Sequence, residues 1–196
     1  EYSLHQALAR DEIDKAREIF ARLLADPDLD PSHRLRLEAE NAYWCHDYDQ
    51  ARDKALEALQ YGEPSVFVLS LLGKSLMRLR EFHSALRCLD LASSMAPLNI
   101  ERLCHISECH IGNDNFEQAK QALEKAADSD PKSEKVKNGQ AKYSLVTGDT
   151  ENAKKLLAEA STLRDVVGFM NNRAVSLSLC DRMEEGVGLY QDAIRA

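Results

Sequence analysis

The sequence predicts an all-α protein made of repeated helical units, and three observations carry this prediction. The residues that favour helices, chiefly Leu, Ala, Glu, Lys, Arg and Gln, dominate the 196-residue chain. Glycine and proline are few, with eight and five residues, which argues against a loop-rich β fold and against disorder. Similar segments also recur about every 34 residues. A period of this length is typical of proteins that stack short helices.

The recurring segments share a small residue near their start, and most have a larger apolar residue four positions later. Such spacing lies on one face of a helix, where a small residue lets a neighbouring helix approach closely. The segments are residues 13–27, 48–62, 82–97, 116–131, 150–163 and 183–194. The small residues are Ala16, Ala51, Ala85, Ala119, Ala153 and Gly186, and the residues four positions later are Phe20, Leu89, Leu123, Leu157 and Tyr190, with Ala55 as the exception. We predict a helix for each segment.

A second helix is predicted before each of these segments. Residues 66–78 and 100–112 each place apolar and small side chains at helical spacing. The two sets are Leu69, Leu72, Gly73 and Leu76, then Leu103, Ile106, Ser107 and His110. Short polar turns separate the two helices of each unit, at residues 46–49, 80–83, 113–116, 147–150 and 181–184. Pro97 and Pro131, which are 34 residues apart, mark where the second helix must end.

These residues resemble the tetratricopeptide repeat family, whose pattern is W-x2-L-G-x2-Y followed by A-x3-F, A and P. The resemblance covers nearly the whole chain and is strongest in residues 66–99 and 100–133. It implies a right-handed α-solenoid of antiparallel helix pairs, with about 12 helices in six units and the first helix of each pair on the concave face. The expected single array runs over residues 1–196, in units of approximately 1–31 (partial), 32–65, 66–99, 100–133, 134–166 and 167–196. Because one helix pair cannot bury its own apolar stripe, neighbouring units must cover it.

A second resemblance is to the helical output region of bacterial two-component response regulators. It rests on the overall sequence of three segments, residues 2–27, 93–119 and 169–194, and on no single motif. The chain begins without methionine and ends within the repeat pattern, so we expect a fragment of a longer protein. In this interpretation a receiver domain with a phosphorylatable aspartate precedes the fragment.

Charge and cysteine usage restrict the expected partners and the compartment. The formal net charge of −8 argues against sequence-independent nucleic-acid binding, which needs a basic surface. No run of about 18 apolar residues is present, so we expect no membrane span. Five cysteines without a disulfide-like framework favour reduced thiols in a cytoplasmic protein.

The segment CHISECH, residues 104–110, suggests a zinc site because it holds two cysteines and two histidines. On one straight helix, however, only His105 and Cys109 share a face, so the four side chains cannot converge on one ion. We therefore expect Cys109 to be a buried small residue and His110 to fill the aromatic position of its helix pair. Phosphate-binding glycine loops and hydrolase motifs are also missing from the sequence. We predict no enzyme activity, no cofactor and no metal ion.

The concave face is the candidate binding site, since the first helices are expected to line it. Helical periodicity predicts that eleven residues form a partner-binding surface there. They are Arg36, Glu40, Tyr43, Trp44, Ser70, Lys74, Met77, Arg78, Glu108, Asn138 and Lys142. Trp44 has two open interpretations, a binding anchor or a residue packed between helices. The co-chaperone clamp for a C-terminal carboxylate is not expected, because Glu40 stands where its asparagine is needed.

Two functions from different classes follow from this prediction. The first is a non-catalytic scaffold that binds a protein or an acidic peptide through the concave face. The second is a structural module that self-assembles, for example as a homodimer, through its terminal helices. The absence of a cap after Ala196 favours the second, because the helix at 183–194 would leave an apolar side uncovered.

Overall fold

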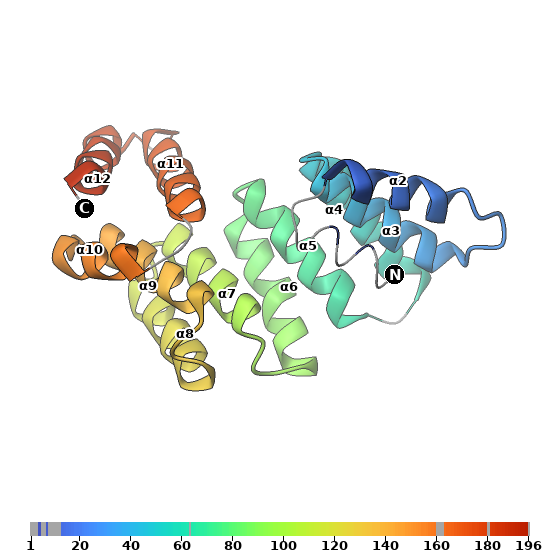
Figure 1. The fold of residues 1–196 in the computed structure, drawn as a ribbon, viewed down its shortest axis with the longest axis horizontal. Coiled ribbons are helices and arrows are strands. Elements are labelled where there is room, and N and C mark those ends of the chain that lie inside the picture. Colours follow the sequence, from blue (N-terminus) through green and yellow to red (C-terminus); the bar gives the residue numbers. More distant parts are fainter. Residues whose placement is uncertain are drawn as a thin grey trace. The chain divides into compact units, whose positions relative to one another are not determined.

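The computed structural model describes residues 13–62, 64–159, 163–179 and 181–195, together with Leu4 and Ala7. Eleven helices and no strand are found in these ranges (Figure 1). The all-α prediction is therefore confirmed. Of the first expected helix pair, only the second helix has described bounds. None of the described helices is long and apolar enough to cross a membrane.

The chain divides into two compact units, Glu1–Met95 and Ala96–Ala196. Unit 1 contains α2 (Ile13–Leu24), α3 (Pro31–Trp44), α4 (Tyr48–Tyr61), α5 (Val66–Arg78) and α6 (Phe82–Met95). Unit 2 contains α7 (Ile100–Gly112), α8 (Phe116–Ser129), α9 (Glu134–Val146), α10 (Thr150–Glu159), α11 (Leu163–Leu179) and α12 (Met183–Arg195).

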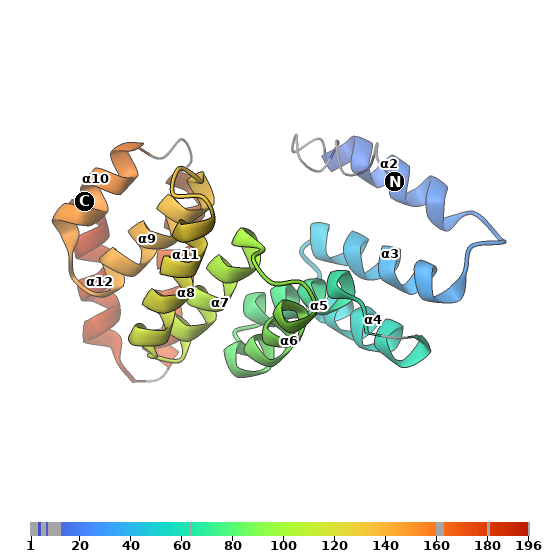
Figure 2. The same cartoon turned by 90° about the horizontal axis from the view of Figure 1, so that it is seen from below.

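Unit 1 is a stack of helix pairs. Helix α3 pairs with α4 and α5 pairs with α6, while α4 packs against α5 and joins the two pairs. The first helices α3 and α5 also contact each other, and α2 lies next to α3 (Figure 2). A buried cluster of Leu4, Ala7, Ala16, Phe20 and Leu37 ties the start of the unit to α2 and α3.

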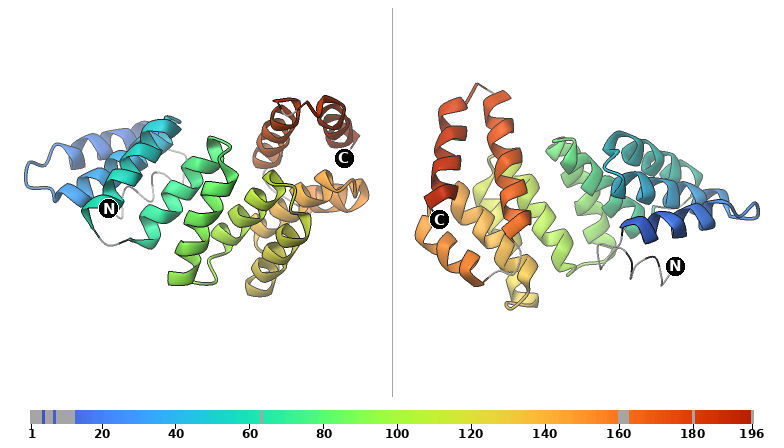
Figure 3. Two further views of the ribbon diagram at one scale, coloured as in Figure 1. Left: turned by 180° about the vertical axis from the view of Figure 1, so that it is seen from behind. Right: turned by 45° about the horizontal axis from the view of Figure 1, so that its top comes forward.

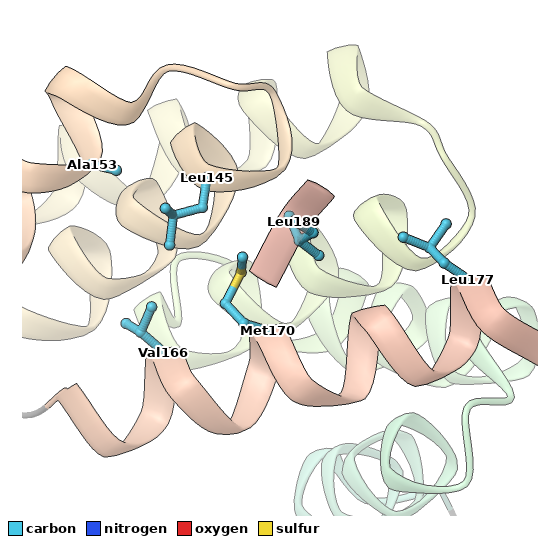
Figure 4. Packing of buried hydrophobic residues seen from close by; sticks show 6 residues of the cluster. All are labelled: Leu145, Ala153, Val166, Met170, Leu177 and Leu189. Atoms are coloured by element: carbon cyan, nitrogen blue, oxygen red, sulfur yellow. The ribbon is translucent and has the colours of Figure 1, made fainter. Parts of the chain in front are cut away.

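Unit 2 has the same pairing for α7–α8, α9–α10 and α11–α12, and Figure 3 shows α11 and α12 side by side. Its last pair packs differently from the others. Here the second helix, α12, contacts both helices of the preceding pair, α9 and α10, while α11 contacts α9. The shared core, shown in Figure 4, is formed by residues from all four helices: Leu145, Ala153, Val166, Met170, Leu177 and Leu189.

The small residues that define the sequence period are buried, as predicted. Ala51, Ala85, Ala119 and Ala153 are each 0% exposed, and Ala16 is 2% exposed. At Gly186 a Cβ would lie 3.1 Å from the carbonyl oxygen of Ala174 in α11. A small side chain at this position is therefore what allows the two helices of a pair to approach closely.

The turn inside each helix pair repeats the same backbone geometry. The residues at His46, Arg80, Asp114, Gly148 and Asp181 have left-handed φ values of 62°, 65°, 59°, 80° and 58°. The amide of the following residue bonds back five positions, for example from Asp47 to Ala42 at 2.9 Å and from Asn115 to His110 at 2.8 Å. This is the Schellman motif, which satisfies the last carbonyls of a helix. It ends each first helix sharply enough for the second to run back antiparallel.

Substitution of Gly73 tests the close approach of α5 and α6. A Cβ at Gly73 would lie 2.7 Å from both Cγ and Cδ2 of Leu89, which is 0% exposed. Because Leu89 has no free space, we expect Gly73→Ala to destabilise the protein by about 1–3 kcal/mol, measured by thermal unfolding. The control is Gly188→Ala in α12, where a Cβ meets nothing within 4 Å and helix propensity favours alanine. Equal effects of the two substitutions would contradict this packing.

Candidate partner-binding face

Unit 1 presents a face on its two adjacent first helices where cations lie over aromatic rings. Arg36 Cζ of α3 lies 5.0 Å from the centroid of the Phe67 ring of α5. In the opposite direction, Lys74 Nζ of α5 lies 5.7 Å from the centroid of the Tyr43 ring of α3. Such contacts contribute about 0.5–1 kcal/mol each at exposed sites. We call this surface the α3–α5 face and define it by Arg36, Tyr43, Phe67, Ser70, Lys74, Met77 and Arg78.

Aromatic rings gather where α3 ends and α4 begins. The Tyr43 ring centroid lies 6.1 Å from that of Trp44 and 5.5 Å from that of Tyr48. His46 Nδ1 is 2.8 Å from Tyr48 Oη across the turn. Burial raises the pKa of the Tyr48 phenol, and the positive charge of Arg78 partly opposes this increase. Arg78 therefore acts electrostatically on this ring cluster from the end of α5.

The members of the predicted set in unit 1 differ in how far they are exposed to solvent. Arg36, Tyr43, Ser70, Lys74 and Met77 are half-buried, and Arg78 is exposed. Glu40 is buried, with 7% of its surface exposed. Trp44 packs against the buried cluster that contains Phe20 and Leu37, as in the second of its two interpretations. A variant of Trp44 would therefore disturb the core as well as any bound partner.

The members of the set in unit 2 are covered more fully, and one of them, Lys142, lies against α11. Lys142 Nζ of α9 lies 2.6 Å from Glu108 Oε1 of α7, and it also lies 5.4 Å from the centroid of the Phe169 ring of α11. The exposed fraction is 2% for Lys142 and 5% for Asn138, and the Glu108 side chain is 19% exposed. The structure thus joins Glu108 and Lys142 in a buried ion pair.

An ion-pair network fastens α11 and α12 to the turn after α7. The Asp114 carboxylate accepts hydrogen bonds from Arg173 of α11 and, at 2.5 Å, from Arg182 in the turn before α12. Arg173 is 8% exposed and also donates to the Gly112 carbonyl at 3.5 Å. Arg182 in turn donates to Glu185 through two bonds of 2.6 and 2.7 Å. This network, which we call the Asp114 clamp, was not predicted from the sequence.

The Asp114 clamp shifts the protonation of its carboxylate. Burial by itself raises the pKa of Asp114, but the hydrogen bonds and charges of Arg173 and Arg182 outweigh burial, so the pKa lies below its usual value. The position of Asp114 in a left-handed turn suits its residue type, because aspartate tolerates this conformation better than most residues. A rigid turn therefore holds the carboxylate where both arginines reach it.

The cysteine and histidine residues of CHISECH lie along α7. Cys104 is 6% exposed and Cys109 is 0% exposed, which confirms that Cys109 is a buried small residue, and His105 and His110 are half-buried. The Cys104 thiol lies 3.5 Å from the Lys135 carbonyl, which accepts its weak hydrogen bond. In the part of the chain that is described, no three side chains of His, Cys, Asp or Glu are grouped as a metal site requires.

Thiol labelling separates the buried cysteines from the exposed one. Burial is the main cause that raises the pKa of Cys104 to about 12, so almost no thiolate forms at neutral pH. Cys45 is exposed. We expect iodoacetamide at pH 8 to modify Cys45 at least about 100-fold faster than Cys104, since the thiolate is the reactive form. Peptide mass spectrometry gives both rates, and equal rates in the folded protein would contradict the packing of α7 against α9.

Comparisons with known proteins agree with this geometry. Residues 100–133, which form α7, α8 and the turn after them, match the family described as tetratricopeptide repeat. The chain contains a tetratricopeptide repeat. This repeat carries Glu108 and Asp114, the carboxylates of the Glu108–Lys142 pair and of the Asp114 clamp. A comparison with curated proteins found no match.

Solved structures of tetratricopeptide-type fold resemble the chain over most of its length. The "MamA RS-1 ArsTM double mutant" has a TM-score of 0.62 at 16% identity, over 88% of this chain and 93% of that chain. MamA 41-end from Desulfovibrio magneticus RS-1 has a TM-score of 0.60 at 16% identity, over 87% and 93%. TTC0263, a thermophilic TPR protein of Thermus thermophilus, has a TM-score of 0.61 at 18% identity, over 84% and 90%. These likenesses support a solenoid of helix pairs and concern the fold alone.

Proposed function

We propose that this chain is a non-catalytic scaffold that binds a protein or peptide partner through the α3–α5 face. The tetratricopeptide pattern predicts that this face lies on the concave side. The main support is that cations and aromatic rings alternate across two adjacent helices and stay partly accessible. Arginine and aromatic side chains are the residues that most often anchor protein interfaces. The corresponding positions of unit 2 are less accessible, because Lys142 and Asn138 are buried.

Site-specific photocrosslinking tests this function. Benzoylphenylalanine is introduced at Ser70 or Met77 of the α3–α5 face, or at the exposed positions His83 or Arg87 of α6 as controls. The chain is then irradiated in extract of its source cell, and covalent adducts are identified by mass spectrometry. We expect one partner to be captured from the first two positions and not from α6. Capture from α6 alone, or from all four positions equally, would contradict the proposal.

Self-assembly through α12 is the second candidate function. Exposed apolar side chains follow one face of this helix at spacings of four, three and four residues: Met183, Val187, Tyr190 and Ile194, which are 63%, 50%, 39% and 84% exposed. An apolar face of this kind favours association with another protein surface. Light scattering over a range of concentrations tests it, with Val187→Lys as the variant. A strictly monomeric wild-type chain would contradict it.

The link to bacterial response regulators stays a prediction. It would place the scaffold after a receiver domain and in the cytoplasm of a bacterium, where phosphorylation would control partner binding. The reading frame upstream of Glu1 in the source genome tests it directly. A receiver domain there would support the link, and an unrelated domain would contradict it.

A further inference from the structure

We propose that α12 of a second copy of this chain packs across α11 and α12, in the way that α9 packs across α7 and α8, and that the two copies cover each other reciprocally. This inference rests on the second candidate function, self-assembly, and adds the contact surface and its geometry. It concerns helices other than those of the α3–α5 face, so the two surfaces can be tested separately.

The α7–α8 pair shows what a covering helix contacts. Ile100 and Cys104 of α7 and Leu123 and Ala127 of α8 form one cluster with side chains of α9. Cys104 is 6% exposed and Leu123 is 3% exposed. At Gly139 of α9 a Cβ would lie 2.6 Å from Leu123 Cδ2 and 3.7 Å from Cys104 Sγ. Helix α9 therefore lies directly on both helices of the preceding pair.

The same positions of the α11–α12 pair are exposed. Asp114 and Asp181 have the same left-handed conformation in the turns of the two pairs and are 67 residues apart, which fixes the correspondence. The counterparts of the four covered residues are Val167, Asn171, Tyr190 and Ile194. All four are exposed, and Tyr190, the counterpart of Leu123, is 39% exposed. Within the described ranges, no helix covers this surface as α9 covers its counterpart.

The exposed residues of the two helices meet in one uncharged surface. Tyr190 Oη donates a hydrogen bond to Asn171 Oδ1 at 2.5 Å and so joins α12 to α11. Because the two helices are antiparallel, this register sets Val175 level with Val187. We call the surface the α11–α12 face and define it by Val167, Asn171, Val175, Leu179, Met183, Val187, Tyr190 and Ile194. All of these except Asn171 are exposed hydrophobic residues, and contiguous hydrophobic surfaces mark sites of association.

One difference between the two pairs selects the chemistry of the occupant. Glu108 of α7 pairs with Lys142 of α9, whereas the counterpart of Glu108 in α11 is Val175. A helix that covers α11 and α12 therefore meets valine where α9 meets a carboxylate, so it should be apolar at the position of Lys142. Helix α12 has this property, because of the described helices it exposes the most large hydrophobic side chains.

A two-fold axis allows both copies to be covered at once. Helix α9 follows α8 after a short turn and runs back along it, so a helix in the corresponding place runs antiparallel to α12. Two α12 helices related by a two-fold axis perpendicular to them are also antiparallel, and such a contact closes as a dimer. The net charge of −8 on each chain opposes association, but none of the residues that define the α11–α12 face is charged.

Sedimentation velocity of the whole chain over a range of concentrations tests the inference. Three substitutions each place lysine at an exposed hydrophobic position: Val187→Lys in α12, Val175→Lys in α11 and, as the control, Leu56→Lys in α4. We expect the wild type to dimerise and the first two substitutions to raise the dimer Kd at least about tenfold, because each puts a charge into the contact. Leu56→Lys should change the Kd less than twofold, and circular dichroism checks that every variant is folded.

The outcomes separate this inference from self-assembly itself. A wild-type chain that stays monomeric overturns both and leaves the α11–α12 face to a helix of another protein. A dimer weakened by Val187→Lys but not by Val175→Lys leaves self-assembly through α12 standing and overturns the packing across α11. Oligomers that keep growing with concentration would show a head-to-tail contact and overturn the two-fold arrangement. Equal effects of Val175→Lys and Leu56→Lys would also overturn the inference.

Discussion

Glu108→Gln is expected to destabilise unit 2 by about 3 kcal/mol, because it removes the carboxylate that faces a buried lysine. Lys142 Nζ lies 2.6 Å from Glu108 Oε1, and the Lys142 side chain is 3% exposed. Water cannot replace the lost charge at this position. The loss of stability is measured by urea unfolding, and hydrogen exchange in α7, α9 and α11 locates it. An unchanged unfolding midpoint would contradict burial of this pair.

The chain contains a matched exposed pair for this experiment. Lys135 Nζ and Glu101 Oε2 also lie 2.6 Å apart, join the same two helices and have the same separation of 34 residues, but their side chains are 60% and 42% exposed. Glu101→Gln should therefore cost less than about 1 kcal/mol. In the double variant Glu108→Gln with Lys142→Met neither charge of this pair remains, so we expect most of the lost stability to return. Equal losses from Glu101→Gln and Glu108→Gln would show that burial does not decide the effect.

Asp114→Asn is expected to loosen α11 and α12 and to destabilise unit 2 by about 1 kcal/mol at neutral pH, because the Asp114 side chain is 42% exposed and its ion pairs are partly screened by water. Asparagine keeps the left-handed turn, which it tolerates well, but it removes the negative charge between Arg173 and Arg182. Arg173 is only 8% exposed, so its guanidinium depends more on this carboxylate than Arg182 does, whose side chain is 38% exposed. Faster hydrogen exchange in α11 and α12, with little change in α8, is the expected result.

The pH dependence of this difference has a definite sign. The folded-state pKa of Asp114 lies below the reference value of 3.8, so the carboxylate stabilises the fold above that value and loses its effect as the pH falls through the folded pKa. Wild type and Asp114→Asn should therefore converge as the pH falls below 3.8 and through the folded pKa of Asp114. Asp181→Asn is the control, because Asp181 has the same left-handed backbone conformation in the turn between α11 and α12 and is not the carboxylate that Arg173 and Arg182 contact. It should change stability by less than about 0.5 kcal/mol. A difference between wild type and Asp114→Asn that does not shrink as the pH falls below 3.8 would contradict the clamp.

Much of the fold is predictable from the sequence because local signals repeat. Ala51, Ala85 and Ala119 stand at constant intervals, and each of them is 0% exposed in its helix pair. The turns are set by short-range hydrogen bonds of the Schellman type, so their period follows that of the helices. Leu69, Leu72 and Leu76 are 4%, 2% and 5% exposed, as their helical spacing predicts.

The arrangement of the last helix pair is much harder to predict. The periodicity places Lys142 on a first helix but does not show that Phe169 covers it. The Asp114 clamp joins residues 59 and 68 positions apart, so it depends on how helices meet and not on the pattern within one unit. One signal was present in the sequence, since Glu108 and Lys142 have opposite charge and are separated by 34 residues, one repeat. In this chain two pairs of opposite charge at that distance, Glu101–Lys135 and Glu108–Lys142, form ion pairs between α7 and α9.

The partner-binding function is tested most directly by hydrogen exchange of the chain with and without the partner captured by photocrosslinking. The scaffold function predicts that bound partner slows exchange in α3 and α5 and leaves α11 and α12 unchanged. Slower exchange confined to the apolar face of α12, where Val187 and Ile194 are exposed, would contradict it and would favour assembly through the terminal helices.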